Sequence, residues 1–310
     1  METPWGHLKD IDLSDHELCE KILAEDKHQL SEGLVVENIF DQIVDAMPTV
    51  RPGSRLLDIE SAIVDTRRSP DRWHVFVLAR SRGPGLGRYL SALERKSRPW
   101  LVELHQPTGT FIAREWKDGM MVGAWRPLDT VMSHLSGGRR QQLEIAANVR
   151  DSQRQKLAFW GFLVGYYGDQ LGMRVVLPRL FLNQGIQPWF RAVWNIDRIL
   201  VDGDDIWALE IKHKFPFGRT GLRFGINDGE LGWIRLLGEA GIRCFHAILA
   251  KPSWTGNSGS GYLLNRIALK ERAALIGVEL DRHRVQAIFA VFAEEFAGNF
   301  NHRHENNGFW

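Results

Sequence analysis

Two acidic residues and a lysine in the second half of the chain have the types and spacing that metal-assisted hydrolysis requires. Asp197 precedes one apolar run, and Glu210 and Lys212 lie in the next. The segment between the runs, VDGDD at residues 201–205, is typical of a tight turn that joins two antiparallel strands. Because side chains alternate between the two faces of a strand, Glu210 and Lys212 share one face.

The register of this predicted hairpin decides whether Asp197 joins that face. If Gly203 and Asp204 form a two-residue turn, Asp197 and Glu210 lie directly opposite each other. If the turn residues are Asp202 and Gly203 instead, Asp197 lies diagonal to Glu210 on the same face. A three-residue loop would place Asp197 on the other face. Both two-residue turns therefore predict a pair of carboxylates on one face.

Two facing carboxylates repel each other, and a divalent cation removes that repulsion. Mg²⁺ prefers carboxylate and carbonyl oxygens and keeps several waters. The predicted metal ligands are Asp197, Glu210 and the carbonyl of Ile211, with Mn²⁺ as the alternative ion. A metal here would lower the pKa of a bound water and polarise a phosphodiester. Lys212 would orient or help deprotonate that water, or stabilise developing charge, so Asp197, Glu210 and Lys212 are the predicted catalytic residues.

The sequence Ile196-Asp197, followed by Glu210-Ile211-Lys212 on the next predicted strand, resembles the PD-(D/E)xK nuclease superfamily. Asp197, Glu210 and Lys212 match the motif residue by residue, and Ile196 stands where the family has a proline. The resemblance implies the catalytic and metal-binding roles of these residues and phosphodiester hydrolysis that depends on Mg²⁺.

The resemblance covers roughly residues 140–252. It implies a restriction-endonuclease-like αβββαβ core with a mixed sheet flanked by helices, and a DNA nuclease of restriction, repair or phage defence. Many members carry an acidic residue on the first helix, for which Glu144 and Asp169 are the candidates. Two alternatives stay open: an RNA-cleaving enzyme with the same site, and a non-catalytic nucleic-acid-binding or assembly subunit that keeps the fold.

The elements that would position these residues follow from apolar periodicity and turn signals. In the second half, the predicted order is a helix over 141–171 that stops at Gly172, strands over 173–181, 190–201 and 205–215, a helix over 228–240 and a strand over 243–252. Two more helices are expected over 263–275 and 281–296. In the first half, helices are predicted over 14–30 and 34–47, and strands over 72–81, 98–106 and 109–116.

These elements predict a mixed α/β protein with two domains. The change of pattern near residue 137 divides a smaller α+β accessory domain, residues 1–136, from a nuclease-like domain, residues 137–310. The accessory domain would bind the substrate or a partner subunit. Its segment 67–98 is locally basic, which is typical of a solvated face or of a surface that holds nucleic acid.

The segment after the motif strand mixes basic residues with phenylalanines. Lys214, Arg219 and Arg223 are the predicted substrate-binding residues, because basic residues beside aromatic rings suit a single strand or a distorted duplex. The alternative is a loop that covers the sheet edge. His246, in the predicted last strand, is interpreted as a core residue.

The composition sets the cellular context. Lys plus Arg number 39 and Asp plus Glu 38, so the overall charge favours neither nucleic acid nor membranes as partners. The N-terminal segment has no apolar stretch typical of a signal peptide, and the longest apolar runs are too short to span a bilayer. Cys19 and Cys244 lie far apart and form no zinc-type spacing. We expect a cytoplasmic protein that binds nucleic acid, preferably DNA, without a membrane partner, as a homodimer or with a partner subunit.

Overall fold

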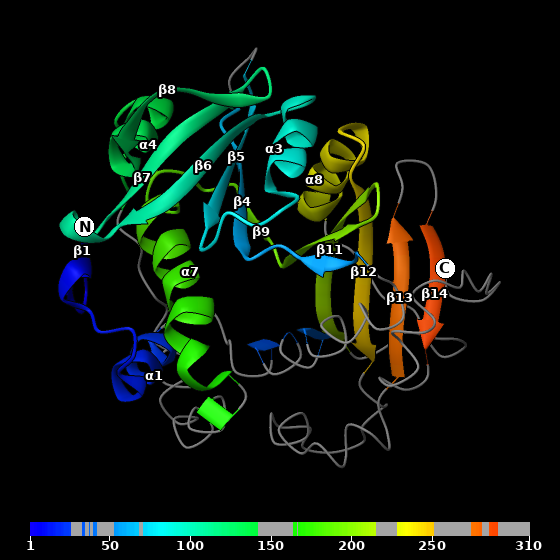
Figure 1. The fold of residues 1–310 in the computed structure, drawn as a ribbon, viewed down its shortest axis with the longest axis horizontal. Coiled ribbons are helices and arrows are strands. Elements are labelled where there is room, and N and C mark those ends of the chain that lie inside the picture. The colour runs from blue at the N-terminus through cyan, green and yellow to red at the C-terminus, as the bar shows by residue number, and fades with distance from the viewer. Residues whose placement is uncertain are drawn as a thin grey trace. The chain divides into compact units, whose positions relative to one another are not determined.

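The computed structural model describes residues 1–25, 33–34, 37, 40–41, 53–67, 71–141, 164–165, 167–214, 228–250, 274–280 and 285–290. The chain divides into two compact units. Unit 1 comprises Met1–Leu30 and Asp58–Ile196, and unit 2 comprises Ser31–Leu57 and Asp197–Trp310. Each unit contains a six-stranded mixed sheet flanked by helices (Figure 1). The predicted mixed α/β fold class is therefore confirmed at this level.

The division differs from the predicted boundary near residue 137. Residues 137–196 belong to unit 1, and residues 31–57 belong to unit 2. The physical reason is strand pairing between segments that are distant in sequence. β9 (Val193–Ile196) pairs with β4 (Ile59–Asp65) in unit 1, and β3 (Arg55–Leu56) pairs with β10 (Arg198–Asp202) in unit 2. Residues 58–196 of unit 1 are thus inserted into the sequence of unit 2 between β3 and β10.

The sheet of unit 1 has the strand order β8-β7-β6-β5-β4-β9. Its remaining strands are β5 (Trp73–Ala79), β6 (Arg98–His105), β7 (Thr110–Lys117) and β8 (Met120–Pro127). Only β5 and β6 pair in parallel. The central strands β4 and β5 are almost wholly buried, which accounts for their continuous apolar sequences. The strands predicted over 72–81, 98–106 and 109–116 are confirmed.

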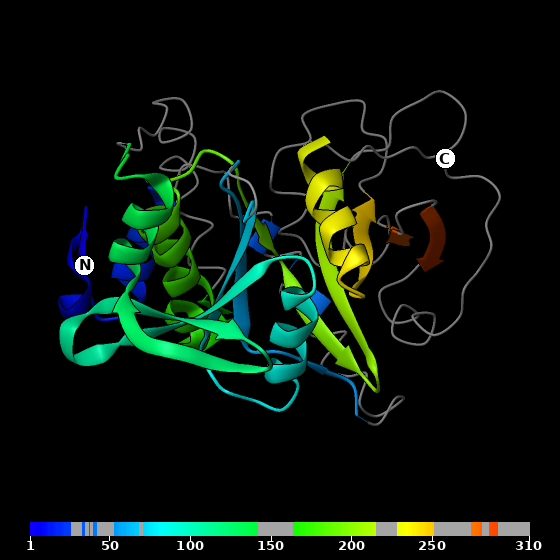
Figure 2. The same ribbon diagram turned by 90° about the horizontal axis from the view of Figure 1, so that it is seen from above.

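Helices cover both faces of this sheet (Figure 2). On one face lies α3 (Leu86–Glu94), whose Tyr89 hydroxyl donates to Ser61 at 3.1 Å. On the other, Phe181 packs edge-on against Phe111 of β7, with ring centroids 5.4 Å apart. Unit 1 also contains α1 (His16–Ala24), α4 (Leu128–Ser136), and the short elements β1 (Glu2–Thr3), β2 (Gly6–His7), η1 (Leu8–Asp10), η3 (Gln106–Thr108) and η4 (Gly168–Gln170).

The strand predicted over 173–181 is wrong. This segment is helical, with η5 (Gly172–Val176), α7 (Leu177–Leu180) and η6 (Phe181–Ile186) in succession. A short apolar run fits a buried helix as well as a strand, and here packing decided for the helix. Gly172 does not end a helix either. A Cβ there would overlap the Leu13 carbonyl oxygen, so this glycine permits close approach of two backbones. Most of the helix predicted over 141–171 lies outside the described residues.

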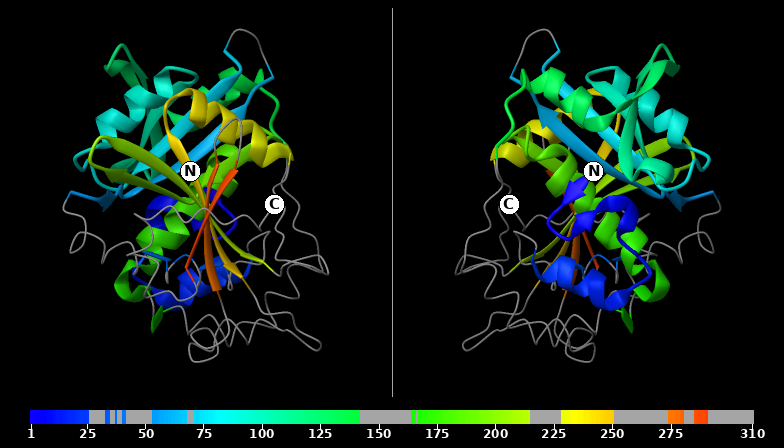
Figure 3. Two further views of the ribbon diagram at one scale, coloured as in Figure 1. Left: turned by 90° about the vertical axis from the view of Figure 1, so that its right-hand side faces the viewer. Right: turned by 90° about the vertical axis from the view of Figure 1, so that its left-hand side faces the viewer.

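The sheet of unit 2 has the order β14-β13-β12-β11-β10-β3. Its strands β11 (Asp205–Lys214) and β12 (Arg243–Ala250) are parallel, with α8 (Asp228–Glu239) between them in sequence. The strands fan out in Figure 3, as the twist of a sheet requires. The predicted elements over 205–215, 228–240 and 243–252 are confirmed. The strand predicted over 190–201 is split, because the chain bends at Asp197 between β9 and β10.

The end of the sheet departs from prediction. β13 (Ala274–Leu280) and β14 (Val285–Ala290) form an antiparallel pair, so the helix predicted over 281–296 is wrong for residues 285–290. Residues 263–273 of the other predicted helix are not described, and its last two residues lie in β13. No helix in the described ranges has the length and apolarity needed to cross a membrane.

Candidate functional site

The hairpin formed by β10 and β11 has the first of the two predicted registers. Asp202 pairs with Asp205, and Gly203 and Asp204 form the turn between them. Gly203 has a φ of 57°, the left-handed conformation that such a turn requires at this position. The ladder continues to Arg198 opposite Leu209. The next position along it places Asp197 opposite Glu210.

This position brings the two carboxylates close together. Opposed residues of an antiparallel pair alternate between hydrogen-bonded and non-hydrogen-bonded pairs, starting from the bonded pair that flanks the turn. Counting from Asp202 and Asp205, Asp197 and Glu210 form a non-hydrogen-bonded pair, the kind in which side chains lie closer. Asp197 is 8% exposed and Glu210 5% exposed. The hairpin therefore holds two acidic side chains side by side in a buried environment.

The bend at Asp197 fixes its carboxylate. Ile196 belongs to β9 and pairs with Ser61 of β4. The chain therefore stops pairing with β11 before Ile196 could lie opposite Ile211. The Ile211 amide instead donates to Oδ2 of Asp197 at 2.6 Å. The N–H and C=O of one residue point toward the same neighbouring strand in such a ladder, so the Ile211 carbonyl is directed to the side where Asp197 lies.

Lys212 and Glu230 join Asp197 and Glu210 in one group of four charged side chains. The Lys212 ammonium forms an ion pair with Oε1 of Glu210, and its Nζ lies 3.9 Å from Oε1 of Glu230 on α8. The other oxygen of Glu210, Oε2, is buried and has no hydrogen-bond partner among the described residues. A buried carboxylate oxygen without a partner is costly, so this atom marks a position where a cation would be stabilising.

The electrostatics of the group are unbalanced. Burial, the neighbouring Asp197 and Glu230 raise the pKa of Glu210 to about 8, although Lys212 opposes this shift. Burial would lower the pKa of Lys212, but the carboxylates of Asp197, Glu210 and Glu230 outweigh it and raise that pKa. One lysine therefore does not neutralise three carboxylates, and the group has capacity for additional positive charge.

The donor set fits a hard divalent cation. Asp197 and Glu210 supply carboxylate oxygens, and Ile211 supplies a carbonyl oxygen directed to the same side. In the described part of the chain there is no cluster of three or more His, Cys, Asp or Glu side chains arranged for a metal. The remaining ligands would have to be waters, which is the coordination that Mg²⁺ favours.

Sequence reasoning missed an arginine that supports the site from the other face of β10. Arg198 makes two hydrogen bonds to the carboxylate of Asp41, at 2.8 and 2.9 Å, and lies 3.3 Å from Glu37. Its Nη1 also donates to the Asp197 carbonyl at 2.6 Å. Glu37 and Asp41 are four residues apart and helical, and that spacing was the available signal. That spacing does not reveal that Arg198 on β10 is the partner of these two carboxylates.

The structure also places the other candidate residues. Of the two candidates for a first-helix acid, Asp169 is an exposed residue of unit 1, with a carboxylate oxygen 3.9 Å from Nε2 of His16. Glu144 lies outside the described residues. His246 is buried, as expected for a core residue, and its register position on β12 is beside Glu210.

The predicted substrate-binding residues are only partly covered by the structure. Lys214 is the last residue of β11, on the strand that carries Glu210 and Lys212. Arg219 and Arg223 lie outside the described residues, so their role stays a prediction.

Comparison of the chain with protein-family models, curated proteins and solved structures gives no match. The resemblance to the PD-(D/E)xK superfamily stays a prediction from the motif residues.

Proposed function

We propose that unit 2 is a Mg²⁺-dependent nuclease that hydrolyses phosphodiester bonds of DNA, with its active site at Asp197, Glu210 and Lys212. The observation that carries the proposal is the buried pair of carboxylates at the end of the hairpin, with the Lys212 ammonium on the same face. Asp197, Glu210 and the Ile211 carbonyl would hold the ion. Lys214, Arg219 and Arg223 would contact the substrate.

The succession of elements in unit 2 supports a restriction-endonuclease-like core. The helical residues 33–34, 37 and 40–41 come first, followed by β3, then β10 and β11, then α8 and β12. This is the order αβββαβ that the resemblance implies, but its first helix and first strand come from residues 31–57. Such a core would be assembled from two segments, because residues 140–196 belong to unit 1.

Each protein group has a role that follows from its position. Bound Mg²⁺ would supply a Lewis acid and a more acidic water. Asp197 accepts a hydrogen bond from the Ile211 amide, which holds its carboxylate in place. Lys212, partly buried beside Glu210, would donate to a phosphate oxygen or orient the attacking water. Glu230 lies near enough to Lys212 to steady the ammonium when Glu210 is engaged elsewhere.

The test is cleavage of supercoiled plasmid, single-stranded DNA and RNA by the full chain with Mg²⁺, Mn²⁺ or EDTA. Glu210→Ala/Lys212→Ala removes the proposed site. Asp197→Asn and Asp204→Asn form a matched pair, because both remove one carboxylate from the same hairpin and Asp204 lies in its exposed turn. We expect metal-dependent cleavage of DNA that is abolished in the double variant and in Asp197→Asn but kept in Asp204→Asn.

Other outcomes would change the proposal. Cleavage of RNA alone would replace DNA as the substrate and keep the site. Binding without cleavage in every metal would indicate a non-catalytic nucleic-acid-binding subunit. Cleavage that persists in the double variant would rule out Asp197, Glu210 and Lys212 as the active site.

A further inference from the structure

The bend at Asp197 is the point where the chain returns to unit 2. Ile196 is the last residue of β9 in unit 1, and Asp197 is the first residue of the second segment of unit 2. Asp197 lies outside both β9 and β10, so the ladder of neither strand fixes its backbone. Other contacts must therefore hold its main chain if its carboxylate is to keep one position.

Arg198 supplies such a contact. Its Nη1 donates to the Asp197 carbonyl oxygen at 2.6 Å. The Ile211 amide donates to Oδ2 of Asp197, also at 2.6 Å. One hydrogen bond thus fixes the main chain of Asp197, and the other fixes its carboxylate. The carboxylate keeps one direction only while both are made, because the side chain pivots on that main chain.

The guanidinium of Arg198 is itself held by an aspartate from a distant part of the sequence. Its Nε and Nη2 donate to the two carboxylate oxygens of Asp41 at 2.8 and 2.9 Å, a bidentate pair that fixes the plane of the guanidinium. This leaves Nη1 for Glu37, at 3.3 Å, and for the Asp197 carbonyl. Because the guanidinium is rigid, the position of Asp41 sets the direction in which Nη1 donates.

Burial strengthens this arrangement. The side chain of Asp41 is 8% exposed and that of Arg198 is 17% exposed. Water competes little for hydrogen bonds in such a place, and bidentate pairs between charged groups are the stronger kind. Glu37 and Asp41 are helical and four positions apart, so they share one face of the helix. That face is directed to Arg198.

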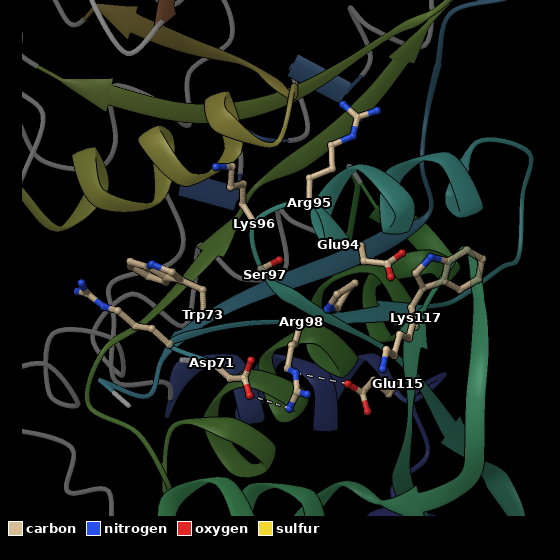
Figure 4. A pocket seen from close by; sticks show the side chains of 12 residues that line it. Asp71, Trp73, Glu94, Arg95, Lys96, Ser97, Arg98, Glu115 and Lys117 are labelled. Carbon is tan, nitrogen blue, oxygen red and sulfur yellow. Dashed lines mark ion pairs between the residues drawn. The ribbon is translucent and has the colours of Figure 1, made fainter. Parts of the chain in front are cut away.

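An arginine between two carboxylates does not by itself indicate a role in a site. In unit 1, Arg98 lies 3.2 Å from Asp71 and 3.7 Å from Glu115, as Figure 4 shows. These ion pairs link β6 to the segments on either side of it and are explained by stability alone. Arg198 differs in its additional contact, because its Nη1 reaches the main chain of Asp197, a proposed metal ligand.

We propose that Arg198, clamped by Asp41, is a positioning residue that holds Asp197 in the orientation in which it binds the metal ion. Through this contact, residues 31–57 contribute to metal affinity without touching the ion. Loss of groups that orient metal ligands in this way commonly lowers metal affinity by about 10- to 100-fold. The effect on metal affinity rests on the proposed function, whereas the effect on the orientation of Asp197 does not.

The first measurement is Mn²⁺ binding to the full chain by isothermal titration calorimetry, which requires no cleavage. Arg198→Lys keeps the charge but loses the bidentate contact, and Asp41→Asn removes the carboxylate that holds the guanidinium. Arg243→Lys is the matched control, because Arg243 pairs with Asp205 at 2.7 Å at the turn end of the same hairpin. Asp197→Asn identifies the heat of binding that belongs to the site.

We expect Arg198→Lys and Asp41→Asn to weaken Mn²⁺ binding at this site by about tenfold or more, with Arg243→Lys unchanged. Equal weakening in Arg198→Lys and Arg243→Lys would overturn the proposal, and so would unchanged affinity in Arg198→Lys and Asp41→Asn. Near-UV circular dichroism checks that each variant is folded, and Asp41→Asn serves alone if Arg198→Lys is not.

The second measurement is amide hydrogen exchange, followed by NMR in EDTA and therefore independent of metal. The Ile211 amide reports on Asp197, which accepts its hydrogen bond. The Trp207 amide, opposite Leu200 in the same hairpin, is the internal reference. In Arg198→Lys, Ile211 should exchange about tenfold faster relative to Trp207 than in the wild type. A merely structural role would accelerate both amides equally, and that result would contradict the proposal.

The two measurements separate this inference from the proposed function. Faster exchange confined to Ile211, in a chain that binds no Mn²⁺, would sustain Arg198 as the residue that positions Asp197 and would remove the metal site. Mn²⁺ binding that is lost in Asp197→Asn but equal in Arg198→Lys and the wild type would keep the metal site and remove the role of Arg198.

Discussion

Two buried carboxylates, Asp65 in unit 1 and Glu210 in unit 2, have pKa values shifted in opposite directions. Burial alone would raise both. At Asp65 the Arg72 guanidinium, at 2.7 and 2.9 Å, and the Arg67 amide outweigh burial and lower the pKa. At Glu210 the neighbouring carboxylates reinforce burial and raise it to about 8. The charge of Asp65 is thus compensated by an arginine, whereas Glu210 lies among like charges, an arrangement that occurs often at functional sites.

The largest difference between variants at Glu210 and at Asp65 should be in the rate of DNA cleavage. Glu210→Gln should lower cleavage by about 10³-fold, because it removes a proposed metal ligand. Asp65→Asn should leave the rate per folded molecule unchanged. Single-turnover cleavage at saturating Mg²⁺ measures both. Equal reductions in the two variants would mean that Glu210 has no special role.

A second contrast lies between ion pairs of the two units. Arg198→Ala should destabilise the protein by about 3 kcal/mol, because it leaves the buried carboxylate of Asp41 uncompensated. Arg82→Ala, at the more exposed pair with Glu103, should cost at most about 1 kcal/mol. Urea unfolding measures both. Arg198→Ala/Asp41→Ala should cost less than the sum of the single changes, and strict additivity would argue against a coupled pair.

In the absence of metal, the free energy of unfolding should also differ between variants at Asp65 and at Glu210, by a smaller amount. Asp65→Asn should cost about 1 to 2 kcal/mol, because it weakens charge-assisted hydrogen bonds to a partly exposed arginine. Below about pH 4.5, where Glu210 is protonated in both the folded and the unfolded chain, Glu210→Gln should change the free energy of unfolding by less than about 1 kcal/mol in EDTA, because an uncharged amide replaces an uncharged carboxyl group. A large destabilisation by Glu210→Gln would indicate a structural role.

The last expected effect is on the pH dependence of stability. Because the folded pKa of Glu210 is raised, the folded state holds its proton between about pH 4.5 and 8, where the unfolded chain has released it. Its contribution to stability is therefore greatest below pH 4.5 and declines as pH rises to 8, by at most about 1.4 kcal/mol per pH unit. In EDTA, the difference between wild type and Glu210→Gln should change in this window. A constant difference would contradict the raised pKa.

The sequence was sufficient for the part of the site that depends on local structure. The turn residues favoured two registers for the hairpin, of which the structure has the one with Gly203 and Asp204 in the turn. The alternation of side chains along β11 placed Glu210 and Lys212 on one face. The elements next to the motif, α8 and β12, were also predicted. Each of these features depends on residues within a few positions of one another, so apolar patterning and turn chemistry carry the information.

Other features required the tertiary structure. The segment 173–181 is helical because its apolar residues pack on a sheet face, which periodicity over so short a run does not reveal. The hydrogen bonds of Arg198 to Asp41 join residues far apart in sequence. No local pattern specifies such a pairing.

By itself, the sequence predicted that Asp197, Glu210 and Lys212 share one face of a hairpin, because that placement follows from turn residues and from the alternation of side chains along a strand. Only the tertiary structure decided that residues 31–57 complete unit 2, that Asp197 sits at a bend held by the Ile211 amide, and that Glu210 is buried among like charges. The physical reason is that burial and long-range pairing depend on how distant segments pack, and packing sets the dielectric and the charges that each group meets.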